Sequence, residues 1–322
     1  MRPEAMPRHL RSLMDLSPRE LKRVLELART VKRNPAAYHG RLAGRSFALV
    51  FSKQSTRTRV SFEVGIAQLG GHSLFLPAGG QTGAQMGRGE TPADTARVLS
   101  RYVQGIIVRW HEHSTIEELA AASSVPVVNA LSDRYHPCQA LADAQALEER
   151  FGSLRGLKLV FVGPANNVSN SLMLAGPRCG FDVTVACPAD LVPEPEVLRR
   201  AMSDAAENGT RVALSHDPAE AVVGANAIYT DTWVSMGQEA EAEALRKKLA
   251  GFRVDAALMS RAAPNAVFMH CLPAHRGEEV TDEVLDGPHS IVLEEAENRL
   301  HAQKALLLLL CGVEPWQTPG SA

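Results

Sequence analysis

Short apolar runs alternate with amphipathic stretches along most of the chain. The runs are rich in Val, Ile, Leu and Phe and are continuous, which favours strands that are buried on both faces. The stretches between them place apolar residues at helical spacing. Strands that alternate with helices in this way predict parallel β-sheets covered by helices. The strands are expected at 46–51, 73–76, 105–109, 127–130, 158–163, 182–186, 211–214, 227–230, 267–270 and 290–293.

The helices between these strands have recognisable starts. Ser17 is expected to cap the first helix, with Pro18 in the first turn and Glu20 completing a capping box. Further helices are expected at 57–69, 91–103, 116–122 and 137–150. A final helix, from about 294 to 311, has no later strand to feed. We therefore expect it to cross back to the first half of the chain.

The chain of 322 residues is long enough for two domains. The glycine-flanked segment 152–156 separates two series of strands and helices. We therefore predict an α/β fold with two domains, each built on a parallel β-sheet flanked by helices. The predicted limits are 1–150 for the first domain, 151–293 for the second, and 294–322 for a C-terminal helix that packs back on the first.

Composition says more about the cellular location of the protein than about its function. The 34 basic and 36 acidic residues leave a net charge of −2, so no overall field would attract nucleic acid or an anionic membrane. The start of the chain lacks the apolar core of a signal peptide. The longest apolar run, 305–311, is far short of the roughly 20 residues that span a bilayer. Five scattered cysteines without zinc-site spacing suit a reducing cytoplasm.

A dense polar cluster, Ser55-Thr56-Arg57-Thr58-Arg59, follows the first predicted strand. A strand-to-helix turn presents free backbone N–H groups to an anion, and the hydroxyl and guanidinium groups add further donors. The alternative is an ordinary capped helix with solvated arginines, but a cap needs only one hydroxyl. Neither a Walker loop nor a complete dinucleotide glycine fingerprint is present. The cluster therefore predicts an oxyanion or phosphate site.

Polar residues also follow other predicted strands, at the edge where open parallel sheets bind ligands. Asp231 would suit an ammonium group and Asn167 a carboxylate, although either residue could instead cap a helix. Arg109 ends a strand and could form a surface ion pair, and His136 could be a core or capping histidine. The residue types alone leave these alternatives open.

Four motifs in register resemble the aspartate/ornithine carbamoyltransferase family. They are STRTR at 55–59, HPCQ at 136–139, DTWVSMG at 231–237 and HCLPA at 270–274. The SMG and HCLP elements resemble the ornithine-using branch of the family. The resemblance extends from about Leu13 to Leu308, which is nearly the whole chain.

The resemblance implies a reaction, a ligand set and an oligomeric state. The carbamoyl group of carbamoyl phosphate would be transferred to the side-chain amine of L-ornithine, giving L-citrulline and phosphate, a step of arginine metabolism. It implies no metal and no organic cofactor. It also implies a homotrimer, or a multiple of trimers. Gln85, in the Gly-rich segment 79–90, would complete the active site of the neighbouring subunit.

The resemblance also assigns roles to individual residues. Carbamoyl phosphate would be bound by Ser55, Thr56, Arg57, Thr58, Gln85, Arg109, His136, Gln139, Cys271, Leu272 and Arg299. Ornithine would be bound by Asn167, Asp231, Ser235 and Met236. The catalytic residues would be Arg57, Arg109, His136 and Cys271. Arg59 would be structural and pair with Glu63, whereas a surface ion pair with Glu295 is the alternative for Arg299.

Proton removal is the chemical step that the sequence leaves open. The side-chain ammonium of ornithine should titrate near ~10.4, as lysine does, and only the neutral amine attacks. Cys271 or Asp231 could assist. A Cys271 nucleophile activated by His270 is not expected, because neighbouring residues on a strand point to opposite faces.

Other functions compete with this interpretation. The same family could use another acceptor, such as putrescine or acetylornithine. A paralogue that binds carbamoyl phosphate without catalysis and an NAD-dependent oxidoreductase are further alternatives. The second of these lacks its glycine fingerprint. The sequence does not distinguish arginine synthesis from arginine breakdown.

Overall fold

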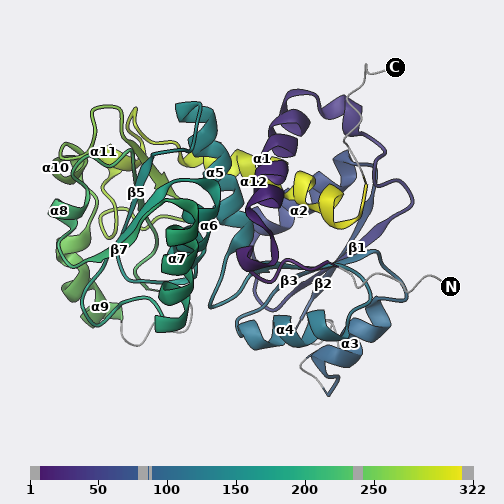
Figure 1. Ribbon diagram of the computed structural model, residues 1–322. Coiled ribbons are helices and arrows are strands. Elements are labelled where there is room, and N and C mark those ends of the chain that lie inside the picture. Colours follow the sequence, from purple (N-terminus) through teal and green to yellow (C-terminus); the bar gives the residue numbers. More distant parts are fainter. Residues whose placement is uncertain (1–7, 79–85, 87–88, 235–241, 314–322) are drawn as a thin grey trace. The chain divides into compact units, whose positions relative to one another are not determined.

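The chain forms two compact units (Figure 1). The computed structural model describes residues 8–78, 86, 89–234 and 242–313. The first unit comprises the chain up to Leu141 together with residues from Asn298 onward, and the second comprises Ala142–Glu297. Both divisions fall inside helices, α5 (Pro137–Phe151) and α12 (Val292–Leu310). The domain limits predicted at 150–151 and 293–294 stay a prediction.

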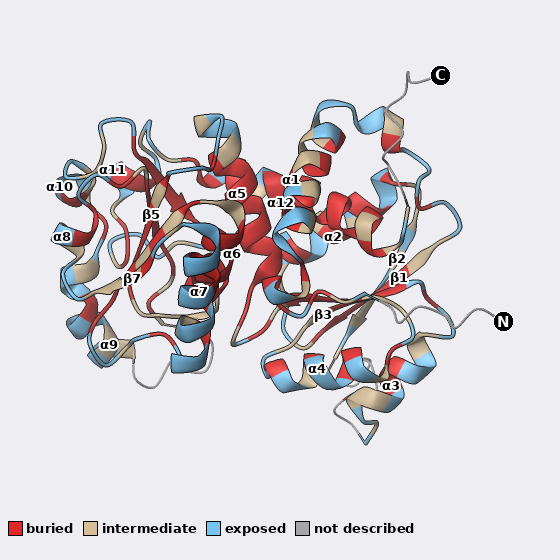
Figure 2. Ribbon diagram, viewed as in Figure 1, coloured by how far each residue is buried: buried red, intermediate tan, exposed pale blue. Residues whose placement is uncertain are grey.

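The first unit is built on a four-stranded parallel sheet in the order β2-β1-β3-β4. Its strands are β1 (Ser46–Phe51), β2 (His72–Pro77), β3 (Gly105–Arg109) and β4 (Val127–Leu131). Strand β1 is central and almost wholly buried, as expected for a parallel strand covered on both faces (Figure 2). Leu10 extends the sheet by a single parallel bridge to Val128 of β4.

The helices of the first unit begin where the sequence provides caps. They are α1 (Pro18–Arg33), α2 (Thr56–Gln68), α3 (Pro92–Leu99) and α4 (His113–Ala122), with short 3₁₀ turns at Leu13–Asp15 and Pro35–Tyr38. The predicted capping box of Ser17 and Glu20 is confirmed at the start of α1. The helix predicted over 91–103 ends early, because Ser100 caps it after Leu99.

The second unit is built on a five-stranded parallel sheet in the order β7-β6-β5-β8-β9. Its strands are β5 (Lys158–Val162), β6 (Asp182–Ala186), β7 (Val212–Ser215), β8 (Ala227–Thr230) and β9 (Val267–His270). Its helices, besides much of α5 and the start of α12, are α6 (Asn167–Cys179), α7 (Pro195–Asn208), α8 (Pro218–Ala221), α9 (Ala242–Leu249), α10 (Ala256–Met259) and α11 (Asp282–Leu285), with a 3₁₀ turn at Ala250–Phe252. Strands β8 and β9 are buried throughout.

The strand predicted at 290–293 is wrong. Ser290 makes only an isolated bridge to Phe268, and helix α12 begins at Val292. Apolar runs this short are compatible with either a strand or the start of a helix. The exposed glutamate that follows, Glu294, favours a helix, because a negative side chain stabilises a helix N-terminus. The other predicted strands are confirmed, each within one residue at either end.

The most apolar stretch of the chain forms the C-terminal half of helix α12. Residues 301–308 are all buried, so most of the leucine run lies in the protein core. Among the described residues, no helix is both long enough and apolar enough to cross a membrane.

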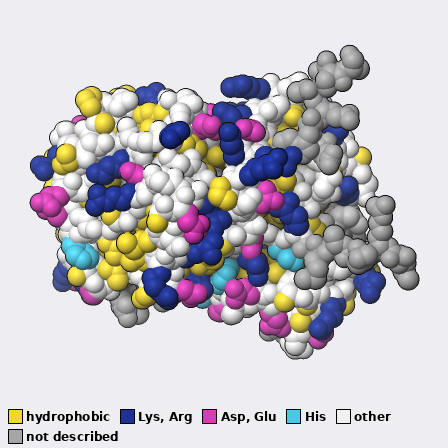
Figure 3. Space-filling view, in the orientation of Figure 1, with side chains coloured by type: hydrophobic (Ala, Val, Ile, Leu, Met, Phe, Trp, Pro, Cys, Tyr) yellow, Lys and Arg dark blue, Asp and Glu magenta, His cyan; other side chains and the backbone are white. Residues whose placement is uncertain are grey.

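Basic and acidic side chains are interspersed over the face shown in Figure 3. This mixture is what the small net charge leads one to expect.

Candidate active site

The predicted anion site lies at the N-terminus of α2, just after β1. Ser55 caps the helix with an extended backbone and accepts a hydrogen bond from the Thr58 backbone N–H at 3.3 Å. Thr58 is buried, whereas Arg57 is exposed to solvent. The first N–H groups of a helix lack intrahelical partners and carry the positive end of its dipole. This turn therefore has the chemistry of an anion site.

Two arginines that are distant in sequence contact this turn, and a glutamine holds one of them. The Thr58 hydroxyl accepts from Arg299 Nη2 at 3.3 Å and lies 3.5 Å from Arg109 Nη1. Arg299 Nη1 also donates to Gln139 Oε1 at 2.8 Å. Strand β3 and helix α12 thus each deliver one predicted residue to the start of α2, and helix α5 supplies the glutamine that holds Arg299. Arg299 is buried, so the alternative of a surface ion pair does not describe it.

The position of Arg109 follows from an irregularity in the sheet. The pairing of β3 with β4 shifts register between Val108 and Arg109. Shifts of this kind commonly re-aim the side chain that follows. The Arg109 carbonyl accepts the Ser52 backbone N–H at 2.9 Å, which ties the end of β3 to the loop that leads into α2.

His136 is buried beside these arginines. Its Nε2 lies 3.3 Å from Arg299 Nη1. A guanidinium group only donates, so Nε2 accepts and the neutral ring carries its proton on Nδ1. Burial lowers the pKa of His136 well below its ordinary value, and the positive charges of Arg299, Arg109 and Arg57 lower it further. His136 is therefore a neutral imidazole at physiological pH.

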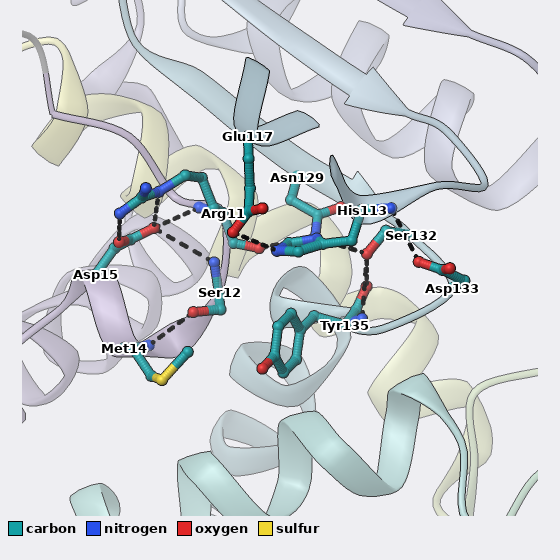
Figure 4. A network of polar contacts seen from close by, with 10 residues as sticks. All are labelled: Arg11, Ser12, Met14, Asp15, His113, Glu117, Asn129, Ser132, Asp133 and Tyr135. Carbon is teal, nitrogen blue, oxygen red and sulfur yellow. Dashed lines mark hydrogen bonds and ion pairs between the residues drawn. The ribbon is translucent and has the colours of Figure 1, made fainter. Parts of the chain in front are cut away.

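A buried polar network holds the turn that precedes His136 (Figure 4). The Ser132 N–H donates to the Tyr135 carbonyl at 2.9 Å, and the Tyr135 N–H donates back to Ser132 Oγ at 3.1 Å. His113 Nδ1 lies 3.0 Å from the same hydroxyl, and Asn129 Nδ2 donates to the Arg11 carbonyl at 2.8 Å. The network fixes the backbone that leads into His136 and α5.

In the second unit, polar side chains gather around Asp231, directly after β8. Asp231 is buried and accepts from Asn166 Nδ2 at 2.7 Å and from the Thr232 backbone N–H at 2.8 Å. The thiol of Cys271 donates to Asp231 Oδ1 at 3.1 Å. The ends of β8 and β9 and the start of α6 thus meet at one carboxylate, as expected at the carboxyl edge of a parallel sheet.

Cys271 is held as a protonated thiol. Burial raises its pKa well above the ordinary value, and the charge of Asp231 and the hydrogen bond to it raise the pKa further. A reactive cysteine needs the opposite environment, in which nearby positive charge favours the thiolate. The geometry therefore disfavours a nucleophilic role for Cys271.

His270 shapes the turn that follows β9. Its Nδ1 accepts the Leu272 N–H at 2.8 Å, so the ring proton is on Nε2, which lies 3.2 Å from Glu279 Oε1. Leu272 has a φ of 57°, in the left-handed region that leucine rarely adopts. Both ring nitrogens of His270 are engaged by groups other than the Cys271 thiol.

Asn166 is a residue to which the sequence assigned no role. It caps α6 through a capping box with Ser169 and also donates to Asp231. Asn167, predicted to meet a carboxylate, is the first residue of α6. The paired asparagines after β5 were the only sequence signal, and they could not show that the first of the two would reach Asp231.

Three predicted ligands lie outside the described residues, namely Gln85, Ser235 and Met236. The structural role predicted for Arg59 is supported, because its Nε donates to Glu63 Oε1 at 3.0 Å. Its guanidinium also lies 3.8 Å from the centre of the Phe75 ring. Such stacking joins α2 to β2 without using the arginine as a ligand.

Two groups in the described part of the chain hold metal-ligand atoms close together. They are Asp231 with His270 and Cys271, and His275 with Glu278 and Glu279. In the first group the Cys271 thiol is protonated and both nitrogens of His270 are hydrogen-bonded. A metal ion would have to displace those partners.

The sequence and fold match known proteins over nearly the whole chain. Residues 8–149 match the carbamoyl-P binding domain of aspartate/ornithine carbamoyltransferase, and residues 155–310 match its Asp/Orn binding domain. An ornithine carbamoyltransferase from Pyrococcus abyssi is 53% identical over 307 residues, 95% of this chain and 96% of that protein. An anabolic ornithine carbamoyltransferase from Pyrococcus furiosus is 52% identical, with 95% and 96% covered.

Solved structures give the same result. The ornithine carbamoyltransferase from Pyrococcus furiosus superposes with a TM-score of 0.91 at 52% identity, covering 95% of this chain and 98% of that one. The enzyme of that name from Thermus thermophilus gives a TM-score of 0.84 at 43% identity, with 95% and 100% covered. By sequence and by fold, the chain belongs to the aspartate/ornithine carbamoyltransferase family.

Proposed function

We propose that the protein is an ornithine carbamoyltransferase, which transfers the carbamoyl group of carbamoyl phosphate to the side-chain amine of L-ornithine and releases phosphate. The observation that carries the proposal is the convergence of Arg109 and Arg299 on Thr58 at the start of α2, with Arg299 hydrogen-bonded to Gln139. The relatives named for this activity support it, since they match the chain over nearly its full length.

The phosphate of carbamoyl phosphate is assigned to the N-terminus of α2. Backbone N–H groups of the first turn, with the hydroxyls of Ser55, Thr56 and Thr58, would donate to its oxygens. The exposed Arg57 side chain supplies a planar fork that suits phosphate. Its positive charge contributes to the lowered pKa of His136, which supports a shared site for the two residues.

Activation of the carbonyl group is assigned to Arg109, His136 and Arg299. The guanidinium groups supply positive charge, while neutral His136 can contribute only a dipolar N–H. Negative charge that develops on the carbonyl oxygen during attack would meet donors that are already oriented. Each such donor is worth about 3 kcal/mol of transition-state stabilisation. Gln139, through its hydrogen bond, holds Arg299 in place.

Ornithine is assigned to the second unit. Asp231 would bind its ammonium groups, Asn167 its carboxylate, and Ser235 and Met236 would complete the contacts. The backbone carbonyls of Cys271 and Leu272 would accept hydrogen bonds from the carbamoyl NH₂. The side-chain ammonium first loses one proton, and the neutral amine then attacks the carbonyl carbon. The bond to the phosphate oxygen breaks, and the leaving phosphate takes up the second proton, which the newly bonded nitrogen releases.

The hydrogen bond between Cys271 and Asp231 indicates which of the two groups can accept a proton from ornithine. Cys271 already donates its proton to Asp231, and its raised pKa keeps it protonated. A protonated thiol cannot accept a proton from the amine. We therefore assign the acceptor role to the Asp231 carboxylate, with the thiol and Asn166 orienting it.

The active form is proposed to be a homotrimer or a multiple of trimers, with Gln85 completing the neighbouring site. Strand β2 is an edge strand, and none of its residues is fully buried: three are exposed and three are partly covered. Val60 and Val64 of α2 and Leu74 of β2 are exposed hydrophobic residues of the same unit. Parallel strands are normally covered on both faces, so this exposure supports a partner subunit there.

The proposed setting is the cytoplasm, since all five cysteines are free and suit a reducing compartment. We propose the biosynthetic direction, toward citrulline, which the description of the Pyrococcus furiosus relative as anabolic supports. No metal or organic cofactor is needed for this chemistry, because carbamoyl phosphate is already an activated donor.

The test is phosphate release from carbamoyl phosphate with four acceptors, namely ornithine, putrescine, acetylornithine and aspartate. We expect turnover with ornithine and background with the other three. Turnover with putrescine or acetylornithine alone would instead identify another acceptor within the same family. Background release with all four acceptors would overturn the enzymatic assignment.

A further inference from the structure

Two carboxyl groups are buried against each other in the second unit. Asp143 lies on α5 and Glu295 lies in the first turns of α12. Neither has measurable exposure to solvent, at 0% each. Carboxyl groups are almost never buried unless they are paired or protonated. None of the four family motifs and no step of the proposed reaction uses either residue.

The contacts of Glu295 require that the pair of carboxyl groups holds one proton. Glu295 Oε2 accepts the backbone N–H of His270 at 3.0 Å. The Glu295 side chain is also hydrogen-bonded to the side chain of Asp143. Two ionised carboxylates both lack a donor, so one of the pair must carry a proton. Glu295 Oε2 already accepts an N–H, whereas the buried Oε1 accepts from no donor among the described residues, so a proton on Glu295 would be on Oε1.

The surroundings favour protonation of Glu295. Burial raises its pKa well above the ordinary value, and the charge of Asp143 and the hydrogen bond between the two raise it further. The His270 N–H and the Tyr229 side chain of β8 act in the opposite direction but are weaker. The charges of Asp143 and Glu295 both act on Cys271, so Glu295 is electrostatically connected to the candidate active site.

We propose that Glu295 is kept as a neutral carboxylic acid that donates its proton to Asp143 and acts as a positioning residue for Cys271. Through the His270 N–H it anchors the last residue of β9, directly before the Cys271 thiol and the turn at Leu272. Neutral Glu295 also avoids a second buried negative charge beside Asp143. Only the kinetic test of this proposal rests on the proposed function. The unfolding test does not depend on it.

The first test measures thermal unfolding of Glu295→Gln and wild type between pH 5.5 and 8.5, without substrate. Glutamine reproduces the neutral acid, because its NH₂ can donate to Asp143 while its oxygen accepts from His270. In wild type the folded state retains a proton that the unfolded chain loses above its ordinary pKa, so wild-type stability falls as pH rises through this window. We expect the Tm of the variant relative to wild type to increase by at least about 3 °C across it.

Glu294→Gln is the matched control, since Glu294 is the preceding residue of α12 and is exposed. The difference between its Tm and that of wild type should stay constant over the whole pH range. A Glu295→Gln variant that is less stable than wild type by a constant amount at every pH would show that Glu295 is ionised in the folded protein. That result would overturn the proposal whatever reaction the protein catalyses.

The second test is kinetic and uses the same variants with carbamoyl phosphate and ornithine. Glu295→Gln should keep kcat within about threefold of wild type at pH 7, and its kcat should fall less at alkaline pH. Glu295→Leu removes both hydrogen bonds and should lower kcat by about tenfold or more, since the Cys271 turn loses its anchor. Loss of activity in a folded Glu295→Gln, with Glu294→Gln unaffected, would show instead that an ionised carboxylate is needed.

Discussion

The charges around His136 determine how this residue can act. Burial is the main reason that its imidazole stays neutral, and the positive charges of Arg299, Arg109 and Arg57 lower its pKa further. A neutral imidazole is a poor proton donor but a good oriented dipole, and the arginines supply the positive charge. A substitution here therefore tests electrostatic stabilisation more than acid–base chemistry.

Arg57→Ala should abolish most turnover without loss of fold. The side chain is exposed, so it contributes little to the core, and the lost phosphate contact should lower kcat/KM by about 10²-fold or more. Arg59→Ala is the matched control, because Arg59 is also exposed but pairs with Glu63. It should retain activity. Wild-type turnover in folded Arg57→Ala would contradict the phosphate site.

The pH dependence of catalysis should come from the substrate. The neutral fraction of an amine with a pKa near ~10.4 grows with pH, so kcat/KM for ornithine should rise by up to about 100-fold between pH 6 and 8. The lowered pKa of His136 and the raised pKa of Cys271 mean that neither group should titrate between pH 6 and 8 and change the slope of this profile. Initial rates at subsaturating ornithine measure this profile, and a flat profile would contradict the neutral amine as nucleophile.

At the scale of elements, continuous apolar strands were predictable because each needs only its own sequence. The same holds for caps and for one-turn pairs such as Arg59 with Glu63. The strand prediction at 290–293 was wrong because a short apolar run does not distinguish a strand from a helix start. The contacts of Asn166 with Asp231 and of Glu279 with His270 were not predictable, because they depend on which strands become neighbours.

Helix α12 packs against α2 through a buried lysine, which makes its stability sensitive to pH. Lys304 is 1% exposed and donates to Gln68 Oε1 at 2.7 Å, and burial lowers its pKa. The unfolded chain therefore binds this proton more tightly, so wild-type stability should rise with pH toward the unfolded pKa near ~10.4.

Lys304→Met should melt at the same temperature as wild type at pH 7, or up to about 5 °C higher. The difference should shrink as the pH approaches 10, because wild type then buries a neutral amine. Calorimetry over this range measures it. Lys22→Met is the control, since Lys22 is exposed on α1, and it should show no such trend. A Lys304→Met protein that melts well below wild type at every pH would contradict the cost assigned to the buried charge.

At the scale of the whole molecule, the chain divides its chemistry between two compact units. The first unit gathers arginines, hydroxyls and a neutral histidine, which suit an anion. The second gathers a buried carboxylate with its amide and thiol partners, which suits an amine. The proposed reaction uses both sets, together with Gln85 from a neighbouring subunit. That last requirement can be tested without a structure of the oligomer.

Two inactive variants should restore activity when they are unfolded together and reassembled. Arg57→Ala removes a ligand from its own subunit's site, and Gln85→Ala removes one from the neighbour's site. In a random 1:1 mixture, about a quarter of the sites would combine an intact Arg57 with an intact Gln85, giving about a quarter of wild-type turnover per site. Each variant reassembled alone is the control and should stay inactive. If Gln85 instead served its own subunit, every site would lack one ligand and the mixture would be as inactive as its parents.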